Sequence, residues 1–258
     1  RDGDPMLILS PADRAAEVPE LVAAGAEELY AGYVPPFWSE AFGPVVSCNR
    51  RSYDEANVGS LEELEALIHS AATRDVPVYI AQNAFPVPDA MIPGLVDQVA
   101  DLARRGVRGA IVSDLSLLLA LRDARFRRME LHASTLFSSF NGMSVAFLRR
   151  AGATRVILAR ELSTAEIAAM TPPAGETRLE AIGFRGRCPN IEGFCTHLHD
   201  DPGRTGPCER RTKRSGAGRG KGFPPECARR SGETRGRTGT TPAGCAPCRC
   251  SSGRASTR

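Results

Sequence analysis

Short apolar or β-branched segments alternate with longer segments of helical periodicity from residue 6 to residue 184. This alternation is typical of repeated βα units, which build a parallel sheet covered by helices. The strand-like segments are residues 6–10, 28–32, 76–82, 109–113, 129–133, 155–159 and 178–183. The helical segments are residues 12–24, 60–74, 91–105, 115–125, 141–150 and 164–170. The sequence therefore predicts an α/β fold.

Several of the predicted helices begin or end at residues that favour a helix terminus. Ser60 precedes one helix and Glu63 follows three residues later, which predicts a capping box. Asp114 stands between a strand and a helix, where its carboxylate can accept hydrogen bonds from the first turn. Gly106 and Gly152 follow helix ends, where a left-handed residue is needed. These signals support the helix boundaries given above.

Two architectures fit this order of elements. One is a (β/α)8 barrel whose last unit is missing or irregular, and the other is an open, doubly wound sheet. A doubly wound nucleotide-binding domain carries a glycine-rich loop after its first strand, but residues 10–13 of this chain read Ser-Pro-Ala-Asp. We therefore predict a TIM-barrel-like fold, incomplete or irregular in its last unit.

Polar residues gather at the carboxyl ends of the predicted strands, where both architectures bind their ligands. His132 is a candidate general base or substrate ligand, or a residue that holds the rim loops together. Arg160 and Glu161 are candidates for an anion-binding or proton-handling pair, or for a buried salt bridge. The strand ends carry Tyr30, Tyr33, Gln82, Asn83, Ser113, Asp114, His132, Ser134, Thr135, Arg160, Glu161, Arg185 and Cys188.

Cys188 and Cys195 follow the last predicted strand, and Cys208 stands close behind them. The chain has 8 cysteines and no recognisable secretion signal, which favours metal binding or catalysis over a disulfide framework. Thiolates at one end of a scaffold can hold an iron-sulfur cluster, or zinc with His197 or His199 as a further ligand. The sequence thus predicts a cysteine-rich metal site at the carboxyl-terminal rim.

Composition divides the chain into four parts. Residues 1–5 are interpreted as an N-terminal extension, residues 6–186 as the barrel and residues 187–210 as the cysteine-rich segment. Residues 211–258 are rich in arginine and glycine and contain almost nothing to bury, so we expect them to be disordered. An RNA-binding tail, a linker to a missing domain, and a truncated or aberrantly translated segment all fit this composition.

The net charge of +3 carries little information about the folded part, because much of the excess is arginine beyond residue 210. No apolar segment approaches the roughly 20 residues that a membrane span requires. We therefore expect a cytoplasmic protein without a membrane span.

Five segments of this chain resemble the U32 peptidase family, over about residues 6–208. The most specific are residues 132–135 (His-Ala-Ser-Thr), residues 155–163 (Arg-Val-Ile-Leu-Ala-Arg-Glu-Leu-Ser) and the spacing Cys-x4-Gly-x-Cys of residues 188–195. Residues 28–32 and 57–61 are similar as well. The resemblance implies a barrel-like fold with a cysteine-rich patch. Some members of the family are collagenase-like proteases. Others hydroxylate RNA bases or ubiquinone precursors without oxygen and hold a 4Fe-4S cluster on four cysteines.

The resemblance implies that Cys188, Cys195 and Cys208 are cluster ligands. The usual fourth cysteine is absent after Cys208, and Cys48 is its predicted substitute because residues 48–51 resemble a Cys-x-Arg-Arg segment of the ubiquinone-hydroxylating branch. Cys227 and the group formed by Cys245, Cys248 and Cys250 are the alternatives. The chain also departs from the family at residues 185–187, where Arg-Gly-Arg replaces small residues before the first cysteine.

The resemblance thus implies an enzyme that hydroxylates RNA or a small aromatic quinone precursor with an iron-sulfur cluster. His132, Arg160 and Glu161 are the expected catalytic residues, and a related partner subunit is expected by analogy. A peptidase and a non-catalytic, zinc-stapled interaction module remain the alternatives. No His-Glu-x-x-His motif is present, which weakens the peptidase interpretation.

Overall fold

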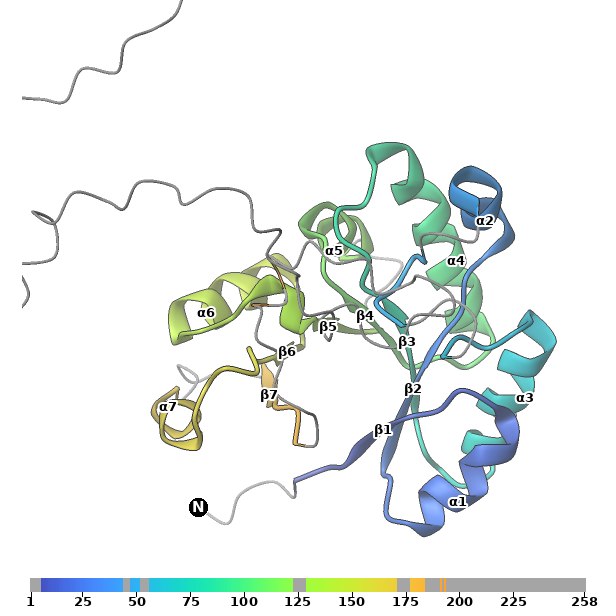
Figure 1. The fold of residues 1–258 in the computed structure, drawn as a ribbon, viewed down its shortest axis with the longest axis horizontal. Coiled ribbons are helices and arrows are strands. Elements are labelled where there is room, and N and C mark those ends of the chain that lie inside the picture. Colours follow the sequence, from blue (N-terminus) through green and yellow to red (C-terminus); the bar gives the residue numbers. More distant parts are fainter. Residues whose placement is uncertain are drawn as a thin grey trace, which may run out of the picture. The chain divides into compact units, whose positions relative to one another are not determined.

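The computed structural model describes residues 6–43, 47–51, 56–122, 129–170, 177–183, 191 and 193. Seven strands form one sheet in the order β1 to β7, and each pair of neighbours is parallel. The sheet is curled into a half-barrel with its helices on the outside (Figure 1). The strand order follows the sequence without the reversal that marks a doubly wound sheet. The predicted TIM-barrel-like fold is confirmed.

Every predicted strand and helix is present, with ends that differ from the prediction by a few residues. The strands are β1 Leu9–Pro11, β2 Glu28–Gly32, β3 Val78–Gln82, β4 Gly109–Val112, β5 Glu130–Ala133, β6 Arg155–Ile157 and β7 Arg178–Glu180. The α-helices are α1 Val18–Ala23, α2 Pro36–Phe42, α3 Leu61–Ala72, α4 Ile92–Arg104, α5 Leu115–Leu121, α6 Gly142–Ala151 and α7 Thr164–Ala169. Short 3-10 helices are η1 Ala15–Glu17, η3 Asp89–Met91 and η5 Thr135–Phe137.

The predicted helix termini have the expected geometry. The Ser60 side chain accepts a hydrogen bond from the Glu63 amide at 3.2 Å, which is one half of the predicted capping box. Asp114 Oδ1 accepts hydrogen bonds from the first turn of α5. Gly106 and Gly152 have φ values of 104° and 115°, in the left-handed region that favours glycine. These contacts explain why α3 and α5 begin, and α4 and α6 end, where they do.

The two faces of the sheet pack against different partners. Leu29 and Ala31 of β2 point outward into the large apolar core between sheet and helices. Tyr30, between them in the sequence, points into the half-barrel, where Tyr79 and Ile111 form a smaller cluster. This alternation follows from the two-residue repeat of a strand. Polar side chains on the inner positions therefore lie inside the half-barrel.

No helix in the described ranges is long and apolar enough to cross a membrane. The predicted boundaries at residues 186/187 and 210/211 lie outside the described residues and stay predictions.

Candidate functional site

The segment that follows α2 folds back over the carboxyl-terminal end of β2. The Val58 amide donates to the Gly32 carbonyl at 2.8 Å, and Asn49 Nδ2 donates to Asn57 Oδ1 at 2.7 Å. A β-carbon on Gly32 would overlap Asn57 and would lie 3.1 Å from Asn49 Nδ2. Glycine at the last position of β2 therefore permits this close approach.

Hydrogen bonds join this segment to the ends of β3 and β5. The Arg50 amide donates to Asn83 Oδ1 at 2.9 Å, and Asn83 Nδ2 lies 3.4 Å from Ser134 Oγ. The Ala84 amide donates to the Cys48 carbonyl at 3.1 Å. Polar residues from three different strand ends therefore converge on one rim, as the sequence predicts.

Contacts with Asp13, Ala56 and Tyr30 hold the Arg51 side chain in position at the rim. Its guanidinium forms an ion pair with Asp13 and donates to the Ala56 carbonyl. Its central carbon lies 4.8 Å from the centroid of the Tyr30 ring, and its side chain is only 10% exposed. Asp13 thus compensates the charge of Arg51, which holds the loop after β2 against the loop after β1.

Cys48 is the one predicted metal ligand among the described residues. Its side chain is 0% exposed, and its Sγ donates to the Tyr33 carbonyl at 3.3 Å. No group of three or more His, Cys, Asp or Glu side chains able to hold a metal occurs among the residues that the structure describes. Cys188, Cys195 and Cys208 lie outside those residues, so the four-cysteine site stays a prediction.

Gly193 shows where part of the cysteine-rich segment lies. A β-carbon on Gly193 would overlap the Leu136 carbonyl oxygen and Ser138 Oγ. Leu136 belongs to η5, which directly follows β5 at the carboxyl-terminal edge of the sheet. Gly193, which stands between Cys188 and Cys195 in the sequence, therefore lies at the same edge of the sheet that the Cys48 loop covers.

His132 faces the inside of the half-barrel rather than the rim itself. Its side chain is 0% exposed, its Nε2 lies 3.3 Å from Glu130 Oε2, and its ring centroid lies 4.4 Å from that of Tyr79. Nδ1 is buried and has no hydrogen-bond partner among the described residues. Because Nε2 faces a carboxylate, it carries the proton, which leaves Nδ1 as a proton acceptor.

A network of charged side chains lies inside the half-barrel, near His132. Arg155 donates to both carboxylate oxygens of Glu28 at 2.6 Å and also to Glu180 at 3.2 Å. The Tyr79 hydroxyl lies 3.1 Å from Glu28 and 3.2 Å from Glu130. This bidentate arginine–carboxylate pair and its neighbours satisfy polar groups that would otherwise be costly to bury.

Burial and hydrogen bonding shift the pKa values of this network in different directions. Burial alone would raise the pKa of Glu130, but hydrogen bonds from His132 and Arg108 hold that pKa at about 2. Burial raises the pKa of Glu180 and of the Tyr79 hydroxyl. Burial also lowers the pKa of His132, so its imidazole is neutral near pH 7.

Arg160 and Glu161 form a turn after β6. Glu161 is exposed and Arg160 is half-buried. Their predicted role as an anion-binding or proton-handling pair stays a prediction.

The charged network is the feature that the sequence analysis missed. Glu28, Glu130, Arg155 and Arg178 are each the first residue of a strand. Because alternate residues of a strand share a face, these charges lie on the same side of the sheet as the residues two positions later, which are Tyr30, His132, Ile157 and Glu180. Charged residues at equivalent positions of successive strands are the signal that could have revealed the network.

The matched family model, Peptidase family U32, covers residues 13–215. The chain is 27% identical over 188 residues to "tRNA hydroxylation protein P" of Escherichia coli (strain K12), a match that spans 73% of this chain and 38% of the relative. It is 27% identical over 198 residues to "23S rRNA 5-hydroxycytidine C2501 synthase" of the same organism, spanning 77% of this chain and 27% of the relative.

Among solved structures, the fold is similar to that of the U32 peptidase Mk0906, with a TM-score of 0.54, 14% identity and 70% of each chain covered. The chain spans less than two fifths of the length of both relatives named above. The family match covers most of this chain, and the solved structure shares its fold. The chain belongs to peptidase family U32.

Proposed function

We propose that this chain is a redox enzyme that hydroxylates RNA and that uses an iron-sulfur cluster held by cysteines at the carboxyl-terminal rim. Its relatives include proteins named for the hydroxylation of tRNA and of 23S rRNA. The observation that supports the proposal most is the packing of Gly193 on the loop after β5. That contact puts Gly193, two residues before Cys195 in the sequence, at the edge on which the Cys48 loop also lies.

We assign Cys188, Cys195 and Cys208 as cluster ligands and Cys48 as the fourth. Cys48 fits this assignment in position, since its loop is hydrogen-bonded to the rim after β3. It also fits in chemistry, since a cysteine thiolate is a soft ligand of the kind that iron-sulfur clusters and zinc require. When bound, a cluster of this kind supplies single electrons at a potential that its protein surroundings tune.

The other proposed site residues act through protons and charge. His132 would accept a proton at Nδ1, because burial keeps its imidazole neutral and Glu130 holds the opposite nitrogen. Arg160 would bind the RNA backbone or another anion, and Glu161 would orient it. A small aromatic substrate in place of RNA is the alternative within the same chemistry.

The proposal is tested by expressing the chain in cells that lack a tRNA-hydroxylating relative and measuring modified nucleosides by mass spectrometry. Cells producing the parent chain are expected to regain a hydroxylated nucleoside in tRNA or rRNA. Cys195→Ala and His132→Gln are expected to abolish that gain at equal protein levels. Hydrolysis of collagen peptides that persists after metal removal, without any nucleoside change, would instead favour the peptidase alternative.

A further inference from the structure

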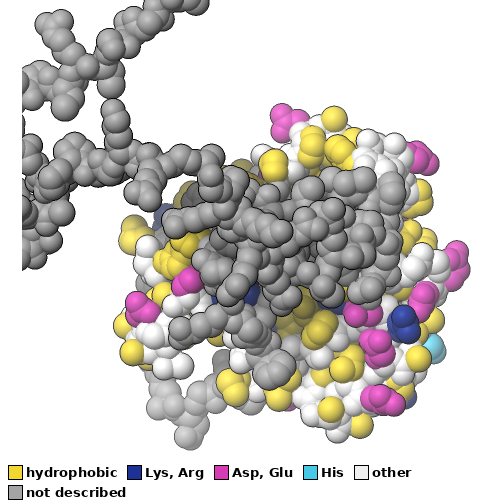
Figure 2. All heavy atoms as spheres, viewed as in Figure 1, with side chains coloured by type: hydrophobic (Ala, Val, Ile, Leu, Met, Phe, Trp, Pro, Cys, Tyr) yellow, Lys and Arg dark blue, Asp and Glu magenta, His cyan; other side chains and the backbone are white. Residues whose placement is uncertain are grey.

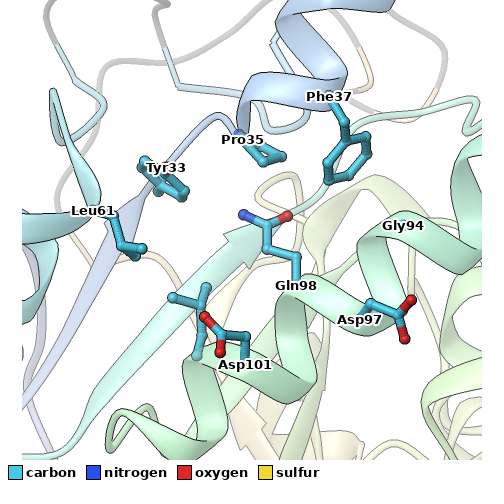
Figure 3. Close-up of a pocket in the computed structure, with 9 residues that line it drawn as sticks. Tyr33, Pro35, Phe37, Leu61, Gly94, Asp97, Gln98 and Asp101 are labelled. Atoms are coloured by element: carbon cyan, nitrogen blue, oxygen red, sulfur yellow. The ribbon is translucent and has the colours of Figure 1, made fainter.

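An open groove of about 510 Å³ lies between the segment that follows β2 and helix α4. Tyr33, Pro35 and Phe37 form one wall, and Leu61 and helix α4 complete it (Figure 3). The walls are mostly apolar. Its volume lies within the range of small-molecule and peptide sites, which is roughly 300–1,000 Å³.

The groove follows the length of α4. Residues 94, 97, 98, 101 and 102 line it. These positions recur at helical spacing and span about 12 Å along the helix axis. An extended peptide advances about 3.3 Å per residue, so three or four residues would match this length. The shape therefore favours an elongated chain over a compact ligand.

Gln98 is a polar residue among the side chains that line the groove. Its amide points from α4 toward Tyr33, Pro35 and Phe37 (Figure 3). Gln98 Oε1 accepts a hydrogen bond from Gln82 Nε2 at 3.2 Å, and Gln98 Nε2 is buried without a partner among the described residues. If the oxygen and nitrogen were exchanged in the amides of both Gln82 and Gln98, the atom without a partner would be the Gln98 oxygen, which is an acceptor. A peptide backbone satisfies either arrangement, since each unit offers an N–H and a C=O.

The charge around the groove is negative. Asp97 is exposed and has no ion-pair partner among the residues that the structure describes, whereas Asp101 is paired with Arg104 and Arg105. Burial raises the pKa of Tyr33; Glu62 lies close enough to raise this pKa further, and Arg105 lies close enough to oppose the rise. Figure 2 shows acidic side chains at several places on this face of the molecule, with basic and apolar side chains between them. The acidic side chains attract cations and repel nucleic-acid phosphates.

We propose that this groove binds a short extended segment of a partner protein, in which an apolar side chain stands between lysine or arginine residues. The apolar side chain fills the space beside Phe37, the peptide backbone bonds the Gln98 amide, and a basic side chain pairs with Asp97. None of the residues that line the groove is a proposed cluster ligand or catalytic residue, and the inference does not depend on the proposed RNA chemistry.

The test is fluorescence anisotropy with labelled, end-capped pentapeptides of sequence Gly-Lys-Phe-Lys-Gly and Gly-Glu-Phe-Glu-Gly. The parent chain is expected to bind the lysine peptide and not the glutamate peptide. Asp97→Asn is expected to weaken binding about threefold, as for a solvent-exposed ion pair. Gln98→Leu is expected to weaken it about fivefold through a lost hydrogen bond. Glu20→Gln, an exposed change on α1, is the matched control and should leave affinity unchanged.

Equal binding of both peptides, or affinity that Asp97→Asn and Gln98→Leu leave unchanged, would overturn the proposal. So would failure of the parent to bind the lysine peptide at millimolar concentration. Concentration-dependent self-association that both variants abolish would also overturn it, because the occupant would then be a second copy. Thermal midpoints of both variants that match the parent establish that the change is local.

Discussion

Arg155 compensates most of the negative charge that lies inside the half-barrel. Its side chain is 5% exposed and that of Glu28 is 4% exposed. Arg155 bonds both oxygens of Glu28 and one of Glu180, whereas Arg178 comes no closer than 3.8 Å to Glu28. Removing one partner of such a pair leaves the other charge buried and poorly compensated.

We expect Arg155→Met to lower the free energy of unfolding by about 3–5 kcal/mol, measured by urea denaturation. The double variant with Glu28→Gln also lacks the uncompensated carboxylate, so it should regain part of the loss. If the free energy of unfolding of Arg155→Met lies within about 0.5 kcal/mol of the parent value, the Arg155–Glu28 pair does not stabilise the interior as described.

The same network predicts that the protein loses stability in acid. Burial lowers the folded pKa of His132 below 6.5. Burial opposes the shift of Glu130, but its hydrogen bonds hold the folded pKa at about 2, below the ordinary 4.5. In both cases the unfolded chain takes up the proton first as pH falls, so protonation favours unfolding. The stabilisation from each group, His132 and Glu130, is fully present at pH values above the pKa that the group has in the unfolded chain.

We therefore expect the free energy of unfolding to fall as pH drops below about 6.5, and again between about 4.5 and 2. His132→Gln should reduce the first slope and Glu130→Gln the second, as measured by urea midpoints across this pH range. An undiminished slope between pH 7 and 5 in His132→Gln would show that His132 is not the group responsible.

Among the elements, the segment after α2 depends on the absence of a side chain at Gly32. We expect Gly32→Ala to lower the free energy of unfolding by about 1–3 kcal/mol, because the new methyl group would overlap Asn57 and the Arg51 stem. Gly142→Ala is the matched control. Its β-carbon would meet nothing within 4 Å, and alanine suits the first position of α6. Equal thermal midpoints for the two variants would contradict the close approach.

Helix α5 depends in the same way on Asp114. This carboxylate accepts hydrogen bonds from Ser116 and Leu117 at 2.8 and 3.2 Å and from Val87 at 3.3 Å. We expect Asp114→Ala to cost about 1–2 kcal/mol in thermal or urea unfolding. Asp114→Asn keeps an acceptor oxygen and should cost less. An alanine variant as stable as the parent would rule out this capping role.

Local signals in the sequence were sufficient for most of these elements. Ser60, Asp114, Gly106 and Gly152 mark helix termini that the structure confirms. Helix α2 is not among the predicted helices. Proline is tolerated in the first turn of a helix, where its missing N–H would have no partner, and α2 begins at Pro36.

The site was predictable only in part. Residues at strand ends converge because parallel strands end at one edge, so Asn83 and Ser134 meet as expected. Gln82 also ends a strand, yet it turns outward to α4. The contact of His132 with Glu130 follows from the two-residue repeat of β5, whereas its contact with Tyr79 of β3 depends on the curl of the sheet. No local pattern specifies this distant neighbour.

At the scale of the molecule, the half-barrel separates its polar features. The rim after β2, β3 and β5 carries the proposed chemistry, and the interior holds a compensated charge network. The groove beside α4 is mostly apolar, with Asp97 and Asp101 among its lining residues. The family match extends across the barrel and the cysteine-rich segment. The central claim is that cysteines of this segment hold an iron-sulfur cluster on the rim.

Metal and acid-labile sulfide analysis, with a visible spectrum, tests that claim most directly on protein purified without oxygen. The parent chain should contain about four irons and four sulfides, as expected for a cubane cluster. Cys195→Ala should lose them, and Cys48→Ala should lose them if Cys48 is the fourth ligand, whereas loss in Cys227→Ala instead would move that role to Cys227. Stoichiometric zinc, or no metal in the parent, would contradict the redox account.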